Sequence, residues 1–72
     1  SQHILKVLDR LYEKPMTNAQ MIADETDVVL GTAYKIIGEM ESMGILKEIT
    51  GEKRGKIYLF AEYIRLFQDK HS

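Results

Sequence analysis

Cysteine is absent from this sequence, and proline occurs only once. Small domains of oxidising compartments usually carry disulfides, so the lack of cysteine favours the cytoplasm. No apolar run approaches the roughly 18 residues that a membrane span needs, and no signal-peptide pattern opens the chain, so we expect no membrane partner. Helix-forming sequence begins directly after Ser1, and 72 residues suffice for one domain. We therefore expect residues 1–72 to be a single domain taken from a larger protein.

The residues that a catalytic site needs are also missing. No cysteine can serve as a nucleophile, and the two histidines, His3 and His71, lie at opposite ends of the chain. The acidic residues Asp24, Glu25 and Asp27 do not have the spacing of a calcium loop, and no glycine-rich phosphate loop occurs. We therefore expect no enzyme activity in this chain, and neither a metal nor a cofactor.

The net charge of −1 hides an uneven distribution. Residues 17–45 carry one cation, Lys35, against five acidic side chains, which gives this segment a net charge of −4. Residues 46–58 carry a net charge of +2, and their cations are Lys47, Lys53, Arg54 and Lys56. A cluster of cations in an otherwise acidic domain favours an anionic partner for that cluster.

The first part of the chain predicts two amphipathic helices. Residues 3–12 contain apolar side chains at helical spacing, namely Ile4, Val7, Leu8, Leu11 and Tyr12. Pro15 ends this helix because proline disfavours helical geometry in the residue before it. The segment from Thr17 to Gln20 fits a capping box, in which each side chain bonds the other residue's backbone N–H. This predicts a second helix over residues 18–25.

A tight turn and a third helix follow. Residues 26–29 contain three β-branched residues, which disfavour helix, and Asp27 tolerates the left-handed geometry of a turn. The third helix is expected over residues 30–43, with Gly44 as a left-handed cap. Its apolar face consists of Ala33, Ile36, Ile37, Met40 and Met43. Ile37 lies at the centre of this face, so we expect it to be almost fully buried.

The last part of the chain predicts a β-hairpin and a short helix. Strands are expected over residues 46–50 and 56–60, around the loop from Gly51 to Gly55. Phe60, Tyr63, Ile64 and Phe67 share a helical face, which predicts a closing helix over residues 61–68. The predicted fold is therefore mostly α with a small β-hairpin: a winged helix-turn-helix with a three-helix core, a two-stranded wing and a short C-terminal helix.

This arrangement predicts a DNA-binding surface in two parts. In helix-turn-helix proteins the start of the second helix of the motif enters the major groove, which here would present Thr32, Tyr34 and Lys35. The wing would contact phosphates through Lys53, Arg54 and Lys56. An acidic third helix opposes DNA binding, so a protein-interaction or scaffolding domain that does not bind DNA remains the alternative.

Further expectations concern the tyrosines and the two ends of the chain. We expect Tyr12, Tyr58 and Tyr63 to be half-buried core residues. Leu5 and Leu66 lie beside the apolar stripes of the two terminal helices, which suggests a homodimer at high concentration.

A resemblance to a known family narrows the prediction. Residues 32–46 are similar to the third helix and first wing strand of many bacterial winged-helix domains. Residues 46–58, which lead into residues 60–67, resemble the C-terminal winged-helix domain of Fic-family proteins (filamentation induced by cyclic AMP). The resemblance implies a preceding catalytic domain that transfers AMP to hydroxyl groups through an HPFxxGNGR loop. Because this chain lacks that loop, only the role of a regulatory accessory domain carries over. A PadR-like or MarR-like transcriptional regulator is the alternative.

Overall fold

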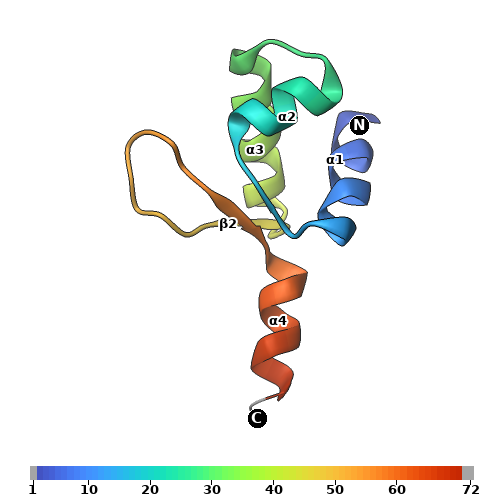
Figure 1. The fold of residues 1–72 in the computed structure, drawn as a ribbon, viewed down its shortest axis with the longest axis vertical. Coiled ribbons are helices and arrows are strands. Elements are labelled where there is room, and N and C mark those ends of the chain that lie inside the picture. Colours follow the sequence, from blue (N-terminus) through green and yellow to red (C-terminus); the bar gives the residue numbers. More distant parts are fainter. Residues whose placement is uncertain (1, 71–72) are drawn as a thin grey trace.

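The computed structural model describes residues 2–70, and within them four helices and a three-stranded antiparallel sheet. The elements in chain order are α1 (Gln2–Glu13), β1 (Met16–Thr17), α2 (Ala19–Thr26), α3 (Leu30–Ser42), β2 (Leu46–Glu48), β3 (Tyr58–Phe60) and α4 (Ala61–Lys70). Figure 1 shows α1, α2 and α3 together at one end, the β2–β3 loop to one side, and α4 running away toward the other end. This is the winged helix-turn-helix that the sequence predicts.

The α1 helix buries the stripe that its spacing predicts, with one exception. Ile4, Val7 and Leu11 are buried, and Leu8 packs against them. Tyr12 is 69% exposed, so the prediction of a half-buried core residue is wrong. Tyr12 lies at the edge of the stripe and covers Phe60 from the solvent side. The two rings are nearly perpendicular, with their centroids 5.1 Å apart.

The start of α2 differs from the predicted capping box. Thr17 belongs to β1, where it is fully buried and pairs with Tyr58 of β3. The N-cap is Asn18, whose side-chain oxygen accepts a hydrogen bond of 2.8 Å from the backbone N–H of Met21. The Gln20 amide donates to Asp24 instead of reaching back. Because Thr17 is paired in β1, the helix begins one residue later and Asn18 is its N-cap. Asparagine is among the residues preferred at this position.

The turn between α2 and α3 has the predicted geometry. Asp27 adopts the left-handed conformation with φ of 56°, and the N–H of Val28 donates to the carbonyl of Ala23 at 3.1 Å. Ala33, Ile36, Ile37 and Met40 of α3 are buried, and Ile37 is only 2% exposed, as predicted.

The end of α3 departs from the predicted apolar face. Met43 is 60% exposed, so its place on that face is wrong. The helix ends at Ser42, and Gly44 with φ of 77° then redirects the chain into β2. Met43 therefore does not continue the buried stripe.

The predicted hairpin is present, and a third strand extends it. Leu46 pairs with Phe60, and Glu48 with Tyr58, while β1 joins the other edge of β3 to give the order β1-β3-β2. The strands are shorter than predicted because the two halves of the hairpin diverge beyond the hydrogen bond from the N–H of Ile49 to the carbonyl of Ile57, at 3.0 Å. We call residues 49–57 the wing. Tyr58 is 5% exposed, so it is buried rather than half-buried.

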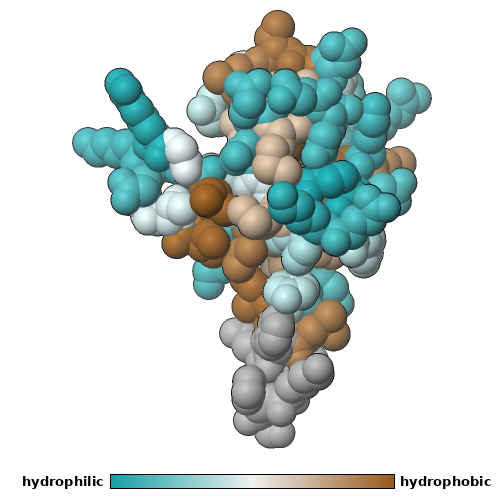
Figure 2. Space-filling view, in the orientation of Figure 1, coloured by the Kyte–Doolittle hydropathy of each residue, from teal (hydrophilic) through white to brown (hydrophobic). Residues whose placement is uncertain are grey.

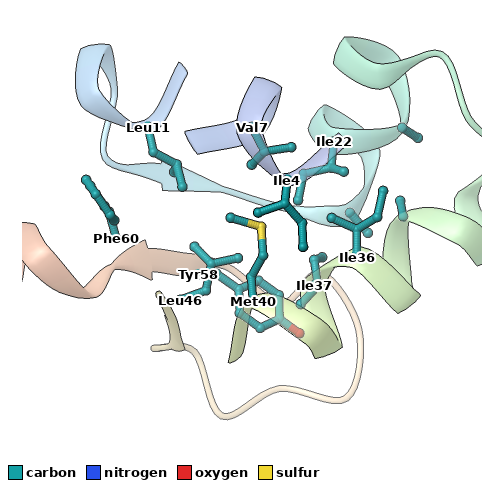
Figure 3. Packing of buried hydrophobic residues seen from close by; sticks show 13 residues of the cluster. Ile4, Val7, Leu11, Ile22, Ile36, Ile37, Met40, Leu46, Tyr58 and Phe60 are labelled. Atoms are coloured by element: carbon teal, nitrogen blue, oxygen red, sulfur yellow. The ribbon is translucent and has the colours of Figure 1, made fainter. Parts of the chain in front are cut away.

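The sheet and the helices share one hydrophobic core. Side chains from α1, α2 and α3 meet Leu46, Tyr58 and Phe60 of the sheet (Figure 3). The α4 helix packs against β3 at its beginning and then leaves the core. Tyr63 is consequently 41% exposed, which corrects the prediction of a half-buried position, whereas Ile64 is half-buried. The Phe67 side chain lies outside the described part of the structure.

Arg10 joins three elements at the side of this core. Its Nε lies 2.6 Å from Oε1 of Glu25 in α2. Its Nη2 donates to the carbonyl of Met16 in β1 at 2.8 Å, and its Nη1 to the carbonyl of Lys14 at 3.1 Å. The side chains of Arg10 and Glu25 are only 19% and 24% exposed. One guanidinium therefore holds α1, β1 and α2 together.

Candidate nucleic-acid interface

A concavity of about 390 Å³ lies between the start of α2, the first half of α3 and the wing. Tyr34 of α3 and Lys53 and Lys56 of the wing line it. Three of the six residues predicted to bind DNA are thus brought to one surface, although the wing and α3 are separate in the sequence. We call this hollow the wing concavity.

The α3 residues of the predicted site do not all point the same way. Tyr34 is 55% exposed, and Lys35 next to it is exposed as well. Thr32 is half-buried. At 100° per residue it lies about 160° around the helix from Tyr34, so Thr32 does not share that face. Glu39 and Glu41 are exposed one to two turns further along α3, so the cationic part of this helix is its beginning.

The wing presents its cations to solvent. Lys53, Arg54 and Lys56 are all exposed, and none forms an ion pair with a carboxylate of residues 2–66, whose side chains the structure describes. Gly51 and Gly55, with φ of 67° and 63°, bound the tip. The projecting wing is hydrophilic over its outer surface (Figure 2). These cations are therefore free to meet an external anion.

The base of the wing is held by one carboxylate. An oxygen of Glu48 accepts hydrogen bonds from the backbone N–H and the hydroxyl of Thr50, each at 2.5 Å, and from the N–H of Gly51 at 2.6 Å. The hydroxyl bond from Thr50 is the main cause that lowers the pKa of Glu48, and Lys56 contributes through its charge. The wing therefore leaves the sheet in a defined direction.

Tyr58 forms part of the wall of the wing concavity although it is 5% exposed. Burial raises the pKa of its phenol, and the nearby charges of Glu41 and Glu48 act in the same direction. Tyr58 therefore keeps its proton at neutral pH and can act as a hydrogen-bond donor.

Several residues of this surface were not predicted from the sequence. Asn18 and Gln20 of the α2 start line the concavity, as does Leu30 of α3. Val29 and Leu30 are 73% and 42% exposed. The sequence does contain a signal for these two residues. Neither belongs to the predicted inner face of α3, so both could have been predicted to be exposed at the start of the helix. Apolar contacts of this kind can meet a thymine methyl group.

Other kinds of site find no support in the described residues. Among residues 2–66, whose side chains are described, no group of three histidine, cysteine or acidic side chains is placed to hold a metal ion. No helix in the same range is long and apolar enough to cross a membrane.

Comparison with known proteins identifies a relative of this chain among the tRNA ligases. No family model matches the chain, and no solved structure matches it. The chain is 36% identical over 62 residues to the phenylalanine–tRNA ligase alpha subunit of Metallosphaera sedula. The match covers 86% of this chain but 13% of the ligase subunit. This winged helix is thus similar to a short segment of a tRNA ligase subunit.

Proposed function

We propose that this winged helix binds nucleic acid, with the start of α3 in the major groove of a DNA duplex and the wing on the phosphates. The observation that carries the proposal is the wing concavity, which places Tyr34 of α3 beside Lys53 and Lys56 of the wing. Tyr34 and Lys35 are exposed at the end of α3 that enters the groove in helix-turn-helix proteins. Arg54 is the third cation of the wing in the proposed interface, whereas Thr32, which does not share the Tyr34 face of α3, is not part of it.

The charge distribution limits how α3 can approach DNA. Glu39 and Glu41 are exposed in the second half of the helix, where they repel phosphates. The helix must therefore enter end-on, with Lys35 leading and the acidic half directed away from the backbone. Only a handful of cations is available, so a single copy binds weakly, and a dimer would bind more tightly.

Fluorescence anisotropy with a labelled duplex at several salt concentrations tests this proposal. If the three wing cations each contact a phosphate, the wing contributes a log–log salt slope of about −2.7. Replacing Lys53 with alanine should weaken binding to all sequences and flatten the slope by about 1. Lys6→Ala, an exposed lysine of α1, is the matched control and should leave the slope unchanged.

A different change is expected at α3. If Lys35 contacts a base edge, Lys35→Ala should reduce discrimination between two sites by roughly 1–3 kcal/mol at one position. The absence of any binding at low salt and high protein concentration would contradict the proposal. The fold would then serve as a protein-interaction or scaffolding domain.

Structured RNA is the second candidate ligand, because the relative with 36% identity is a subunit of a tRNA ligase. The same basic wing would contact RNA phosphates, which do not require a major groove that a helix can enter. A folded tRNA and a DNA duplex of similar charge should therefore be titrated side by side. Tighter binding of the tRNA at equal salt would favour RNA.

The resemblance of residues 46–67 to the C-terminal domain of Fic-family proteins supports a role as an accessory module. In this proposal the winged helix has no catalytic role and acts in the cytoplasm, beside the catalytic domain of a longer chain. A PadR-like or MarR-like regulator is the alternative for the parent protein. The coding sequence upstream of Ser1 tests this directly, because a Fic-type HPFxxGNGR motif there would identify the parent.

A further inference from the structure

We propose that the wing concavity is a phosphate-binding pocket in which the start of α2, Tyr58 and the wing lysines hold one phosphate group together. This deepens the proposed function, because in a nucleic-acid complex the occupant is a backbone phosphate. The same chemistry would also accept the phosphate of a free nucleotide. Three independent features of the structure support the pocket: open helix N–H groups, a largely buried tyrosine whose hydroxyl bonds to no described residue, and two lysines at the edge.

The first turn of α2 supplies backbone donors. The Asn18 side chain accepts from the N–H of Met21, three residues further along the chain. The N–H groups of Ala19 and Gln20 precede that position and find no acceptor among the described residues. Both residues line the wing concavity. Free N–H groups at the positive end of a helix attract anions, and phosphate most of all.

Tyr58 supplies the second feature. The residue is only 5% exposed and its ring extends from β3 toward Ile37 of α3 (Figure 3). Its hydroxyl forms no hydrogen bond with the described residues, and it is not sealed from solvent, because Tyr58 lines the wing concavity. A ligand oxygen placed in the wing concavity would accept a hydrogen bond from this hydroxyl.

The charge around the concavity selects an anion. Lys53 and Lys56 line it, while no acidic residue does. Glu41 and Glu48 are near enough to act on the Tyr58 phenol but do not form the wall. The volume of about 390 Å³ exceeds that of one phosphate group and leaves room for an attached sugar beside the exposed Tyr34 ring. The pocket is therefore suited to a phosphate within a nucleotide.

Two-dimensional amide NMR of the ¹⁵N-labelled chain tests the pocket with inorganic phosphate, at an ionic strength held constant with chloride. The amide signals of Ala19 and Gln20 should move in a saturable manner. Tyr58→Phe should raise the phosphate concentration for half-saturation about tenfold, as expected for one hydrogen bond to a charged group. Tyr12→Phe makes the same chemical change at an exposed ring outside the pocket and should behave as the parent chain.

Lys56→Gln provides a second variant, which removes charge from the edge without touching the core. The pocket is refuted if the Ala19 and Gln20 signals do not move, or if Tyr58→Phe and Tyr12→Phe bind phosphate equally well.

A labelled DNA duplex then separates the phosphate pocket from the proposed nucleic-acid function. Duplex binding that is identical in both tyrosine variants keeps the proposed function and excludes the pocket. Saturable phosphate binding without duplex binding keeps the pocket, for a free phosphorylated ligand, and overturns the proposed function. Titration with adenosine monophosphate tests whether the free phosphorylated ligand is a nucleotide.

Discussion

Replacement of Arg10 with alanine should destabilise the domain more than any other change at a charged residue. The substitution removes an ion pair to Glu25 and two hydrogen bonds to the carbonyls of Lys14 and Met16. Breaking a fully buried pair costs about 3–5 kcal/mol, whereas an exposed pair contributes about 0–1 kcal/mol. The Arg10 and Glu25 side chains are 19% and 24% exposed, so the loss should lie between these limits, at about 2–3 kcal/mol.

Urea denaturation followed by circular dichroism measures this loss. A domain of this size has about 5 kcal/mol of stability in total, and a loss of about 2 kcal/mol lowers the melting temperature by roughly 10 °C. Glu25→Ala should cost less than Arg10→Ala, because the guanidinium keeps its two bonds to backbone carbonyls. Lys6→Ala, on the same helix but exposed, is the control. If Arg10→Ala and Lys6→Ala agreed within about 0.5 kcal/mol, Arg10 would not join the three elements as described.

Three further outcomes are expected. Ile37→Ala should cost about 2–5 kcal/mol, because Ile37 is 2% exposed at the centre of α3, and a melting temperature within a few degrees of the parent would contradict its burial. The lowered pKa of Glu48 means that its contribution to stability is present above its ordinary pKa of 4.5 and is lost as pH falls through the lowered value. Glu48→Gln should therefore remove part of the acid sensitivity of the Thr50 amide signal, and an unchanged acid titration of that signal would refute the role of the carboxylate. Leu5 and Leu66 are 64% and 58% exposed, and sedimentation should show a dimer at millimolar concentration, whereas a clean monomer would exclude one.

Local patterns were sufficient to predict the helices and the hairpin. The 3.6-residue period of α1 and α3 predicts their buried faces, because each face meets a single core. Errors fall at the edges of these faces. Tyr12 and Met43 continue the apolar spacing, but the core ends before it reaches them.

The β1 strand and the wing concavity could not be predicted in the same way. Met16 and Thr17 are too few residues to form a pattern, and their strand exists only because β3 lies beside them. The cap at Asn18 depends on the same pairing, because it becomes the first free residue after β1. Solvent exposure of the wing cations was predictable from composition. Their position opposite the start of α2 depends on the tertiary structure, and so does that of Tyr58.

The pairing of β1 with β3 has a consequence for how the chain folds. The α2 and α3 helices are adjacent in sequence and can form their contacts early, since short loops close quickly. The central strand of the sheet, by contrast, arrives late in the chain, and it supplies Tyr58 and Phe60 to a core that α1 lines with Leu11. During synthesis the N-terminal helices must therefore wait, with part of their apolar face uncovered, until β3 has left the ribosome. Completion of the sheet should be the last and slowest step, and a chain cut before Tyr58 should remain unfolded.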